Sequence, residues 1–159
     1  DCKYGVSLYD NRIALSLHKG GCKPDPRGDE GYHQFVYSLC PHPGPFTTQS
    51  VVYPAYALNN PVLTTAGRTD YRAPVTTDSD HVIIETVKPC EKQEKAFIAR
   101  LYECEGSQAE VVLRPGFDAK SVAVTDMLET VEQTLTPQED KSYRLTFRPF
   151  EIKTLKFWY

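Results

Sequence analysis

The amino-acid sequence predicts an all-β protein built as an antiparallel β-sandwich. From residue 81 onward, short runs alternate apolar and polar side chains, as strands with one buried face do. Turn residues separate these runs at the spacing typical of a sandwich. Helical signals are poor, because the best window, residues 127–140, contains several β-branched residues and Pro137. We therefore expect at most a short turn at residues 137–140.

The chain opens with a predicted hairpin. Residues 6–9 and 12–17 flank Asp10-Asn11, a dipeptide common in tight turns. A polar loop rich in glycine, proline and acidic residues follows. A second alternating strand is predicted over residues 33–40, and the prolines beyond it end the strand because proline cannot donate to a sheet ladder.

The residue composition changes twice in the middle of the chain. Residues 46–58 are apolar and aromatic in patches, so we expect strand or irregular structure there. Residues 59–80 carry turn and linker chemistry with little periodic apolar content, although Val75 could pack on a neighbour. We place the domain boundary in this second segment, which gives domains 1–75 and 76–159.

Seven strands are predicted beyond the linker, the last of them after the break at Pro149-Phe150. Trp158 and Tyr159 are expected to belong to the core and the strand end rather than to a binding platform. The predicted strands cover residues 82–87, 97–102, 111–113, 122–124, 127–135, 143–148 and 152–158.

Composition excludes several classes of partner. The 159 residues carry a net charge of −3 and no Lys/Arg cluster, which argues against nucleic acid. No apolar run approaches the ~18 residues that a membrane span needs, so no membrane partner is expected. The five cysteines have an odd count and no C-x-x-C spacing, which indicates reduced thiols and a cytoplasmic protein. The abrupt first and last residues suggest a piece of something longer.

The polar loop contains the residues most capable of catalysis or of binding a ligand. Asp25, Asp29 and Glu30 could form a glycosidase carboxylate pair or hard-cation ligands. The same residues in Pro-Asp-Pro and Gly-Asp-Glu-Gly contexts are typical turn caps, and we favour that interpretation. The spacing matches no full calcium loop.

The histidines give a weak metal signal. His33 and His42 lie at an odd separation on the predicted strand and so on opposite faces. Their spacing to Cys22 and Cys40 matches no zinc module. We favour surface or hydrogen-bonded histidines, and expect no metal in this segment. The sequence also lacks a G-x-S-x-G elbow and a phosphate-cradling glycine loop.

A series of short motifs nevertheless recurs in a characteristic order along the whole chain. The most specific is the D-x-G-x-H-x-F-x-Y run from Asp29 to Tyr37. The others are Asp1-Cys2-Lys3-Tyr4-Gly5, Leu15-Ser16-Leu17, Pro24-Asp25-Pro26, Leu39, Pro41-His42, Ala57-Leu58-Asn59-Asn60-Pro61, Glu85-Thr86-Val87-Lys88, Arg100-Leu101-Tyr102-Glu103 and Arg148-Pro149-Phe150-Glu151-Ile152-Lys153-Thr154-Leu155.

In this order, the motifs resemble the C-terminal region of glycoside hydrolase family 38 α-mannosidases, of the bacterial and cytosolic type. Ala14 stands where that family usually has a longer basic or polar residue, a small departure. The resemblance implies the end of a large β-sandwich over residues 1–75, followed by a small immunoglobulin-like sandwich over residues 76–159.

The resemblance also implies a function for the parent protein. Family members are retaining exo-acting enzymes that remove terminal α-mannose from oligosaccharides. They need zinc, held by two His and two Asp of an N-terminal catalytic domain, and one of those Asp is the nucleophile. No residue of this chain matches those motifs, so the chain is expected to carry no cofactor and to be inactive alone. Its expected partners are that catalytic domain and a mannose-containing oligosaccharide.

Asp25, Asp29 and His33 are then expected at the rim of the substrate pocket, where they could hydrogen-bond sugar hydroxyls. Two other functions stay open at this point. A free-standing carbohydrate-binding sandwich would need exposed coplanar aromatic rings, and a protein-interaction module would need a large apolar patch. Open strand edges in residues 1–75 could also pair with a second copy of the chain, giving a homo-oligomer.

Overall fold

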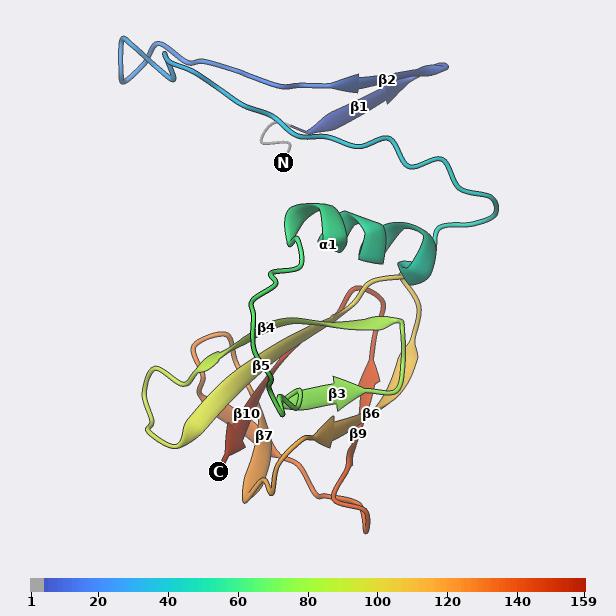
Figure 1. The fold of residues 1–159 in the computed structure, drawn as a ribbon, viewed down its shortest axis with the longest axis vertical. Helices are drawn as coiled ribbons and strands as arrows, with labels where there is room; N and C mark the ends of the chain where they lie inside the picture. The colour runs from blue at the N-terminus through green and yellow to red at the C-terminus, as the bar shows by residue number, and fades with distance from the viewer. Residues whose placement is uncertain (1–4) are drawn as a thin grey trace. The chain divides into compact units, whose positions relative to one another are not determined.

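A computed structural model describes residues 5–159, which form two compact units, Asp1–Pro43 and Gly44–Tyr159 (Figure 1). The first motif of the family resemblance, at residues 1–5, and Cys2 with it, lie largely outside the described residues. The units divide some thirty residues before the boundary expected at 75/76. The assignment of residues 1–75 to a larger sandwich stays a prediction.

The first unit contains the expected hairpin. Strands β1 (Val6–Tyr9) and β2 (Arg12–Leu15) pair antiparallel, with Leu8 opposite Ile13. Asp10 adopts a φ of 49° in the connecting turn, a conformation that Asp tolerates better than most residues. The hairpin prediction is confirmed, although β2 ends two residues earlier than expected.

The second strand expected in this unit does not form. Residues 33–40 contain neither strand nor helix, and Tyr37 and Leu39 are exposed. The alternating pattern is present, but a strand also needs a neighbour for its backbone N–H and C=O groups, and no strand in residues 5–159 pairs with this segment. The prediction of a strand over residues 33–40 is therefore wrong.

The second unit begins with helix, where strand or irregular structure was expected. A π-helical turn, η1 (Thr48–Val52), continues into α1 (Tyr53–Asn59). Thr47 caps its start, because the side chains of Thr47 and Ser50 each accept a hydrogen bond from the other's backbone N–H. Proline is also tolerated in the first turn of α1, where its missing N–H costs little.

Eight strands then build the sandwich (Figure 1). One sheet has five strands in the order β4-β5-β10-β7-β8, and the other has three in the order β3-β6-β9, with all pairings antiparallel. The strands are β3 (Val75–Thr77), β4 (Val82–Pro89), β5 (Ala96–Glu103), β6 (Ala109–Pro115), β7 (Ser121–Thr125), β8 (Val131–Thr134), β9 (Tyr143–Phe147) and β10 (Ile152–Trp158).

The core of the second unit is built by alternating residues from both sheets. Leu113 and Phe147 from the three-stranded sheet and Leu101, Leu155 and Phe157 from the five-stranded sheet are completely buried in one cluster. This is the arrangement that period-two patterning predicts for a two-layer β-protein. The all-β sandwich fold is confirmed.

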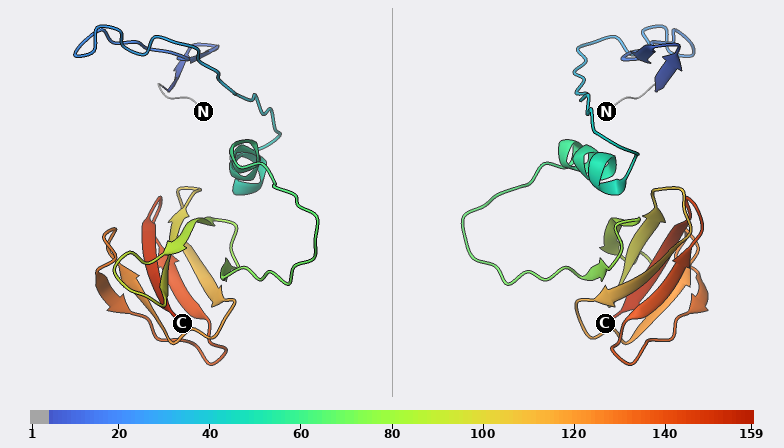
Figure 2. Two further views of the ribbon diagram at one scale, coloured as in Figure 1. Left: turned by 60° about the vertical axis from the view of Figure 1, so that its left-hand side comes forward. Right: turned by 90° about the vertical axis from the view of Figure 1, so that its right-hand side faces the viewer.

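All seven predicted strands have a counterpart, but one is shortened and an eighth strand was not predicted. The strand expected over residues 127–135 is shortened to β8, because residues 126–130 form a turn in which Glu129 has a φ of 66°. Strand β3 was not predicted, because its Thr76-Thr77 pair lies in a segment with the composition of turns and linkers. Residues 60–74 between α1 and β3 contain no helix or strand, as linker composition suggested (Figure 2).

Cys22, Cys90 and Cys104 are free thiols, as predicted for them. Within residues 5–159, no helix is both long enough and apolar enough to cross a membrane.

Candidate functional site

The polar loop of the first unit folds back on itself through turns. The Asp25 carboxylate accepts a hydrogen bond from the backbone N–H of Arg27 at 3.0 Å, and the Gly28 N–H donates to the Asp25 carbonyl at 3.1 Å. Gly28 is required here, because it has a φ of 53° and a Cβ would lie 2.4 Å from the Gly21 carbonyl oxygen. Asp25 therefore caps a turn, as turn chemistry predicted.

The loop encloses a small hollow of about 240 Å³, and the three predicted rim residues relate to it differently. Asp29 lines the hollow, whereas Asp25 and His33 are not among its lining residues. The His33 ring instead lies 4.4 Å from the His18 ring, and its Nε2 is 2.6 Å from the Asp29 carbonyl oxygen. The three residues share one loop, and their role at a pocket rim stays a prediction.

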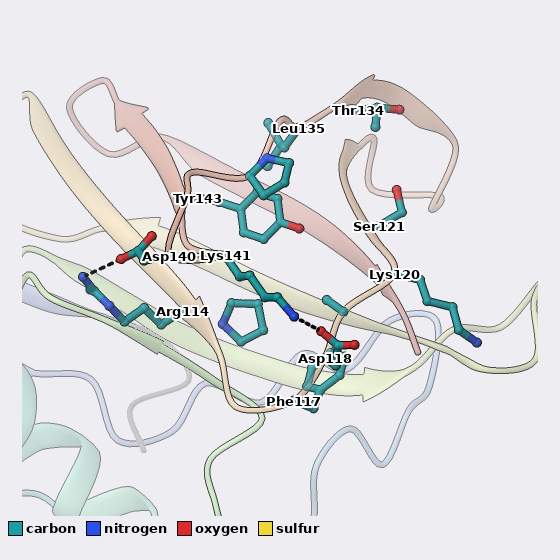
Figure 3. Close-up of a pocket in the computed structure, with 13 residues that line it drawn as sticks. Arg114, Phe117, Asp118, Lys120, Ser121, Thr134, Leu135, Asp140, Lys141 and Tyr143 are labelled. Atoms are coloured by element: carbon teal, nitrogen blue, oxygen red, sulfur yellow. Dashed lines mark hydrogen bonds and ion pairs between the residues drawn. The ribbon is translucent and has the colours of Figure 1, made fainter.

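A larger hollow of about 650 Å³ opens in the second unit, at one end of the sandwich (Figure 3). The segment between β6 and β7 supplies one wall, and the segment from the end of β8 to the start of β9 supplies another. Its lining residues are Arg114, Pro115, Phe117, Asp118, Ala119, Lys120, Ser121, Thr134, Leu135, Pro137, Asp140, Lys141 and Tyr143.

Two ion pairs connect these walls, as the dashed lines in Figure 3 show. Lys141 Nζ lies 2.6 Å from Asp118 Oδ1, and Arg114 Nη2 lies 3.7 Å from Asp140 Oδ2. The hydrogen bond from Lys141 lowers the pKa of Asp118 below its ordinary value. A hydrogen bond from the Ser142 side chain is the main cause of the lowered pKa of Asp140. Both carboxylates thus stay ionised at neutral pH, each beside a cation of the opposite wall.

Helical residues 48–59 are held to the strands by specific hydrogen bonds. The backbone N–H and the hydroxyl of Thr48 both donate to Glu105 Oε1 at 2.7 Å, and Thr48 is completely buried. The Tyr56 hydroxyl lies 3.2 Å from the Tyr102 hydroxyl on β5. The bonds from Thr48 lower the pKa of Glu105, so the carboxylate stays ionised to accept them.

Glu103 is a completely buried carboxylate that joins two turns. Its oxygens accept hydrogen bonds from the backbone N–H groups of Glu105, Gly106, Ser107 and Phe150, at 2.9 to 3.2 Å. Burial by itself would raise the pKa of Glu103, but these four donors outweigh it and the pKa is lowered. The Ser107 hydroxyl also donates to Glu103 Oε1, at 3.3 Å, and the arrangement is structural because all these donors belong to two turns of the same sandwich.

Glu129 has a comparable structural role across the five-stranded sheet. It is 6% exposed and accepts hydrogen bonds from the Cys90 thiol at 3.0 Å, the Lys88 ammonium at 2.6 Å and the Glu91 N–H at 2.9 Å. The bond from Cys90, followed by that from Lys88, lowers the pKa of Glu129 to about 2. The carboxylate thereby ties the β7–β8 turn to the end of β4.

These arrangements connect elements of the second unit to one another. Within residues 5–159, no group of three or more His, Cys, Asp or Glu side chains is placed to hold a metal ion. Sequence reasoning missed Glu103, Glu129 and the 650 Å³ hollow. A run of four residues with small or polar side chains after Glu103 was the only local sign of a turn that a carboxylate could bind.

Comparison with known proteins gives consistent matches. Residues 81–155 match the model described as glycosyl hydrolases family 38 C-terminal beta sandwich domain. The chain is 35% identical to alpha-mannosidase 2C1 of Mus musculus and to that of Homo sapiens, over 98% of this chain and 16% of either protein. It is 32% identical to alpha-mannosidase G of Dictyostelium discoideum, over 99% of this chain and 15% of that protein. The chain thus spans about a sixth of the length of the curated relatives it matches.

Proposed function

Because the chain belongs to glycoside hydrolase family 38, as part of its C-terminal β-sandwich region, we propose that it completes a retaining, zinc-dependent exo-α-mannosidase. The parent enzyme would hydrolyse terminal α-D-mannose from oligosaccharides. This chain would support the catalytic domain and the rim of its pocket, and it would be inactive by itself. The printed names of the relatives, all alpha-mannosidases, support the reaction class.

In the part of the chain that the structure describes, the side chains are not arranged as a zinc site would require. Residues 5–159 bring together no set of three metal-ligating side chains, and Asp25 already caps a turn through its carboxylate. We therefore assign the zinc ligands and the nucleophile to the rest of the protein, the five-sixths of the relatives' length that this chain does not span.

The proposed supporting role rests on one apolar face of the hairpin. Val6, Leu8, Ile13 and Leu15 alternate along β1 and β2, and their pairing places all four on the same face. Leu8 is 75% exposed and Ile13 is 69% exposed. An isolated two-stranded hairpin is at best marginally stable in water, so such a face is suited to packing against another layer. We assign that layer to the remainder of the enzyme.

The test uses the full-length enzyme with Leu8→Asp and Ile13→Asp combined. Two carboxylates placed in a buried interface would be desolvated without partners, so we expect a loss of several degrees in Tm or failure to accumulate folded enzyme. Leu128→Asp is the matched control, because Leu128 is equally exposed but lies in the β7–β8 turn of the sandwich. An unchanged Tm in the hairpin variant would refute the supporting role.

The rim is tested in the same background. If Asp29 and His33 contact substrate hydroxyls, Asp29→Ala with His33→Ala lowers kcat/KM for an α-mannoside about tenfold or more, since hydrogen bonds to charged groups contribute about 1.5–3 kcal/mol. Asp70→Ala, in the irregular segment before β3, serves as control. Equal kcat/KM in wild type and the double variant would remove the loop from the substrate site.

The free thiols Cys22, Cys90 and Cys104 support a reducing compartment, and we propose the cytoplasm. The open edges of β1 and β2 leave pairing with a second copy of the chain as part of the proposal.

A further inference from the structure

The 650 Å³ hollow at the end of the sandwich has the dimensions of a small-ligand site. It is formed within one compact unit whose strands are fixed by a continuous core, so its walls are held in place before any ligand arrives. Pro115 and Pro137 contribute rigid apolar edges, and Ser121 and Thr134 contribute hydroxyl groups. The mixture of apolar surface and a few polar groups is typical of ligand sites.

Tyr143 presents a hydroxyl group to the hollow from a side chain that is otherwise buried. Its side chain is only 4% exposed, and burial raises the pKa of its phenol. The hydroxyl itself keeps accessible surface, because His42 Nδ1, and not Tyr143 Oη, is the fully buried side-chain polar atom without a partner within residues 5–159. The Tyr143 hydroxyl forms no hydrogen bond with any residue from 5 to 159 and points toward the middle of the lining residues (Figure 3). A ligand hydroxyl in the hollow would supply a hydrogen-bond partner.

Phe117 supplies an aromatic surface whose orientation is fixed. Its ring centroid lies 5.4 Å from that of Phe97, 6.4 Å from that of Phe157 and 6.3 Å from that of Tyr159, and all three contacts have edge geometry. The same ring lines the hollow. Rigid aromatic side chains give contact area at little cost in conformational entropy, which suits the C–H face of a sugar ring.

The charges in the hollow favour a neutral ligand over an anion. Asp118 and Asp140 are each paired with a cation from the opposite wall, Lys141 and Arg114. The remaining cation, Lys120, directs its ammonium group away from the other lining residues (Figure 3). The paired carboxylates keep acceptor lone pairs for ligand hydroxyls, and the ammonium groups keep donors.

We propose that this hollow is a carbohydrate-binding site that takes one hexose ring of an oligosaccharide. Tyr143 and the paired Asp118 would bond sugar hydroxyls, and Phe117 would contact the ring's apolar face. The proposal does not depend on the enzyme activity proposed above, because it rests on the sandwich alone.

The test is a titration of the intact, ¹⁵N-labelled 159-residue chain with methyl α-D-mannopyranoside, D-galactose and inorganic phosphate. We expect saturable amide shift changes at residues 117–121 and 141 with at least one hexose. Tyr143→Phe removes one hydroxyl and keeps the ring, so binding should weaken about threefold to tenfold, the worth of one neutral hydrogen bond. Ser121→Ala is a second variant outside the core and should also weaken binding.

Tyr56→Phe is the matched control, because its hydroxyl contacts Tyr102 and does not line the hollow. Binding by this variant should equal that of the wild type. The proposal is overturned if no hexose gives saturable shifts at these amides, or if phosphate alone does. Unchanged affinity in both Tyr143→Phe and Ser121→Ala would overturn it as well. Loss of α-mannosidase activity in a full-length enzyme would bear on the proposed function and not on this site.

Discussion

The hairpin of the first unit and the strands of the second unit follow the same alternating pattern, but they bury it very differently. Leu113 on β6 and Leu101 on β5 are completely enclosed between the two sheets, whereas Leu8 on β1 and Ile13 on β2 are largely exposed. Both pairs lie on regular antiparallel strands with defined register. Alternation therefore determines which residues share a face, while a second layer determines whether that face is buried.

The two units therefore differ in what covers their apolar faces. The second unit is stabilised by its own core, because its two sheets cover each other's apolar faces. The first unit instead leaves an apolar face exposed, since β1 and β2 form its only sheet among the described residues. A substitution should thus act on unfolding in one unit and on association with the rest of the protein in the other.

The largest expected effect tests that separation directly. In the 159-residue chain, Leu113→Ala should lower the free energy of unfolding by about 2–5 kcal/mol, because it leaves a cavity in a fully packed core. Leu8→Ala should change it by less than about 0.5 kcal/mol, as exposed substitutions usually do. Urea unfolding followed by Trp158 fluorescence measures both. Similar losses in the two variants would show that the hairpin is buried in the isolated chain.

Acid should act on the second unit through Glu129. Its pKa is about 2 in the folded state against an ordinary value of 4.5, so the folded state favours the ionised carboxylate. The resulting stabilisation is fully present above about pH 5 and is lost as the pH falls toward about 2. Urea unfolding at a series of pH values should therefore show a flatter acid response for Glu129→Gln than for wild type. Parallel curves would mean that Glu129 contributes nothing to acid sensitivity.

The smallest effect concerns the attachment of the helical segment. Thr48→Val removes the hydroxyl that donates to Glu105 and contacts the Cys104 sulfur at 3.1 Å, at a local cost of about 1–2 kcal/mol. Amide hydrogen exchange should accelerate in α1 and stay unchanged in β1 and β2. Thr48→Ser keeps the hydroxyl and should retain wild-type protection. Equal acceleration with Ser would assign the effect to packing of the methyl group.

The sandwich strands could be predicted because each carries its own signal. The alternation of Tyr143, Leu145 and Phe147 with exposed residues is local, and β9 has exactly the expected start. Residues 33–40 show a similar pattern without a strand, because pairing depends on a neighbour that no local pattern supplies. The helix at residues 48–59 was missed although Thr47 and Ser50 form a capping box and Pro54 sits in the first turn of α1, since Val51 and Val52 favoured a strand.

The candidate sites were less predictable for a similar reason. Asp25 was correctly interpreted as a turn cap, because its bond to Arg27 is two residues away in sequence. The 650 Å³ hollow joins Arg114 with Asp140 and Asp118 with Lys141, pairs more than twenty residues apart. The antiparallel pairings of β6 with β9 and of β7 with β8 bring those segments together, and residue types alone do not reveal these pairings.

The irregular segment between α1 and β3 is where we expect proteases to cleave the chain. Val62 and Leu63 are almost fully exposed, and Arg68 and Arg72 offer trypsin two cleavage points in the same stretch. A nick there would cut the chain between α1 and the sandwich without breaking the bonds from Thr48 to Glu105. The helix would remain as a non-covalent ligand of the domain it was cut from.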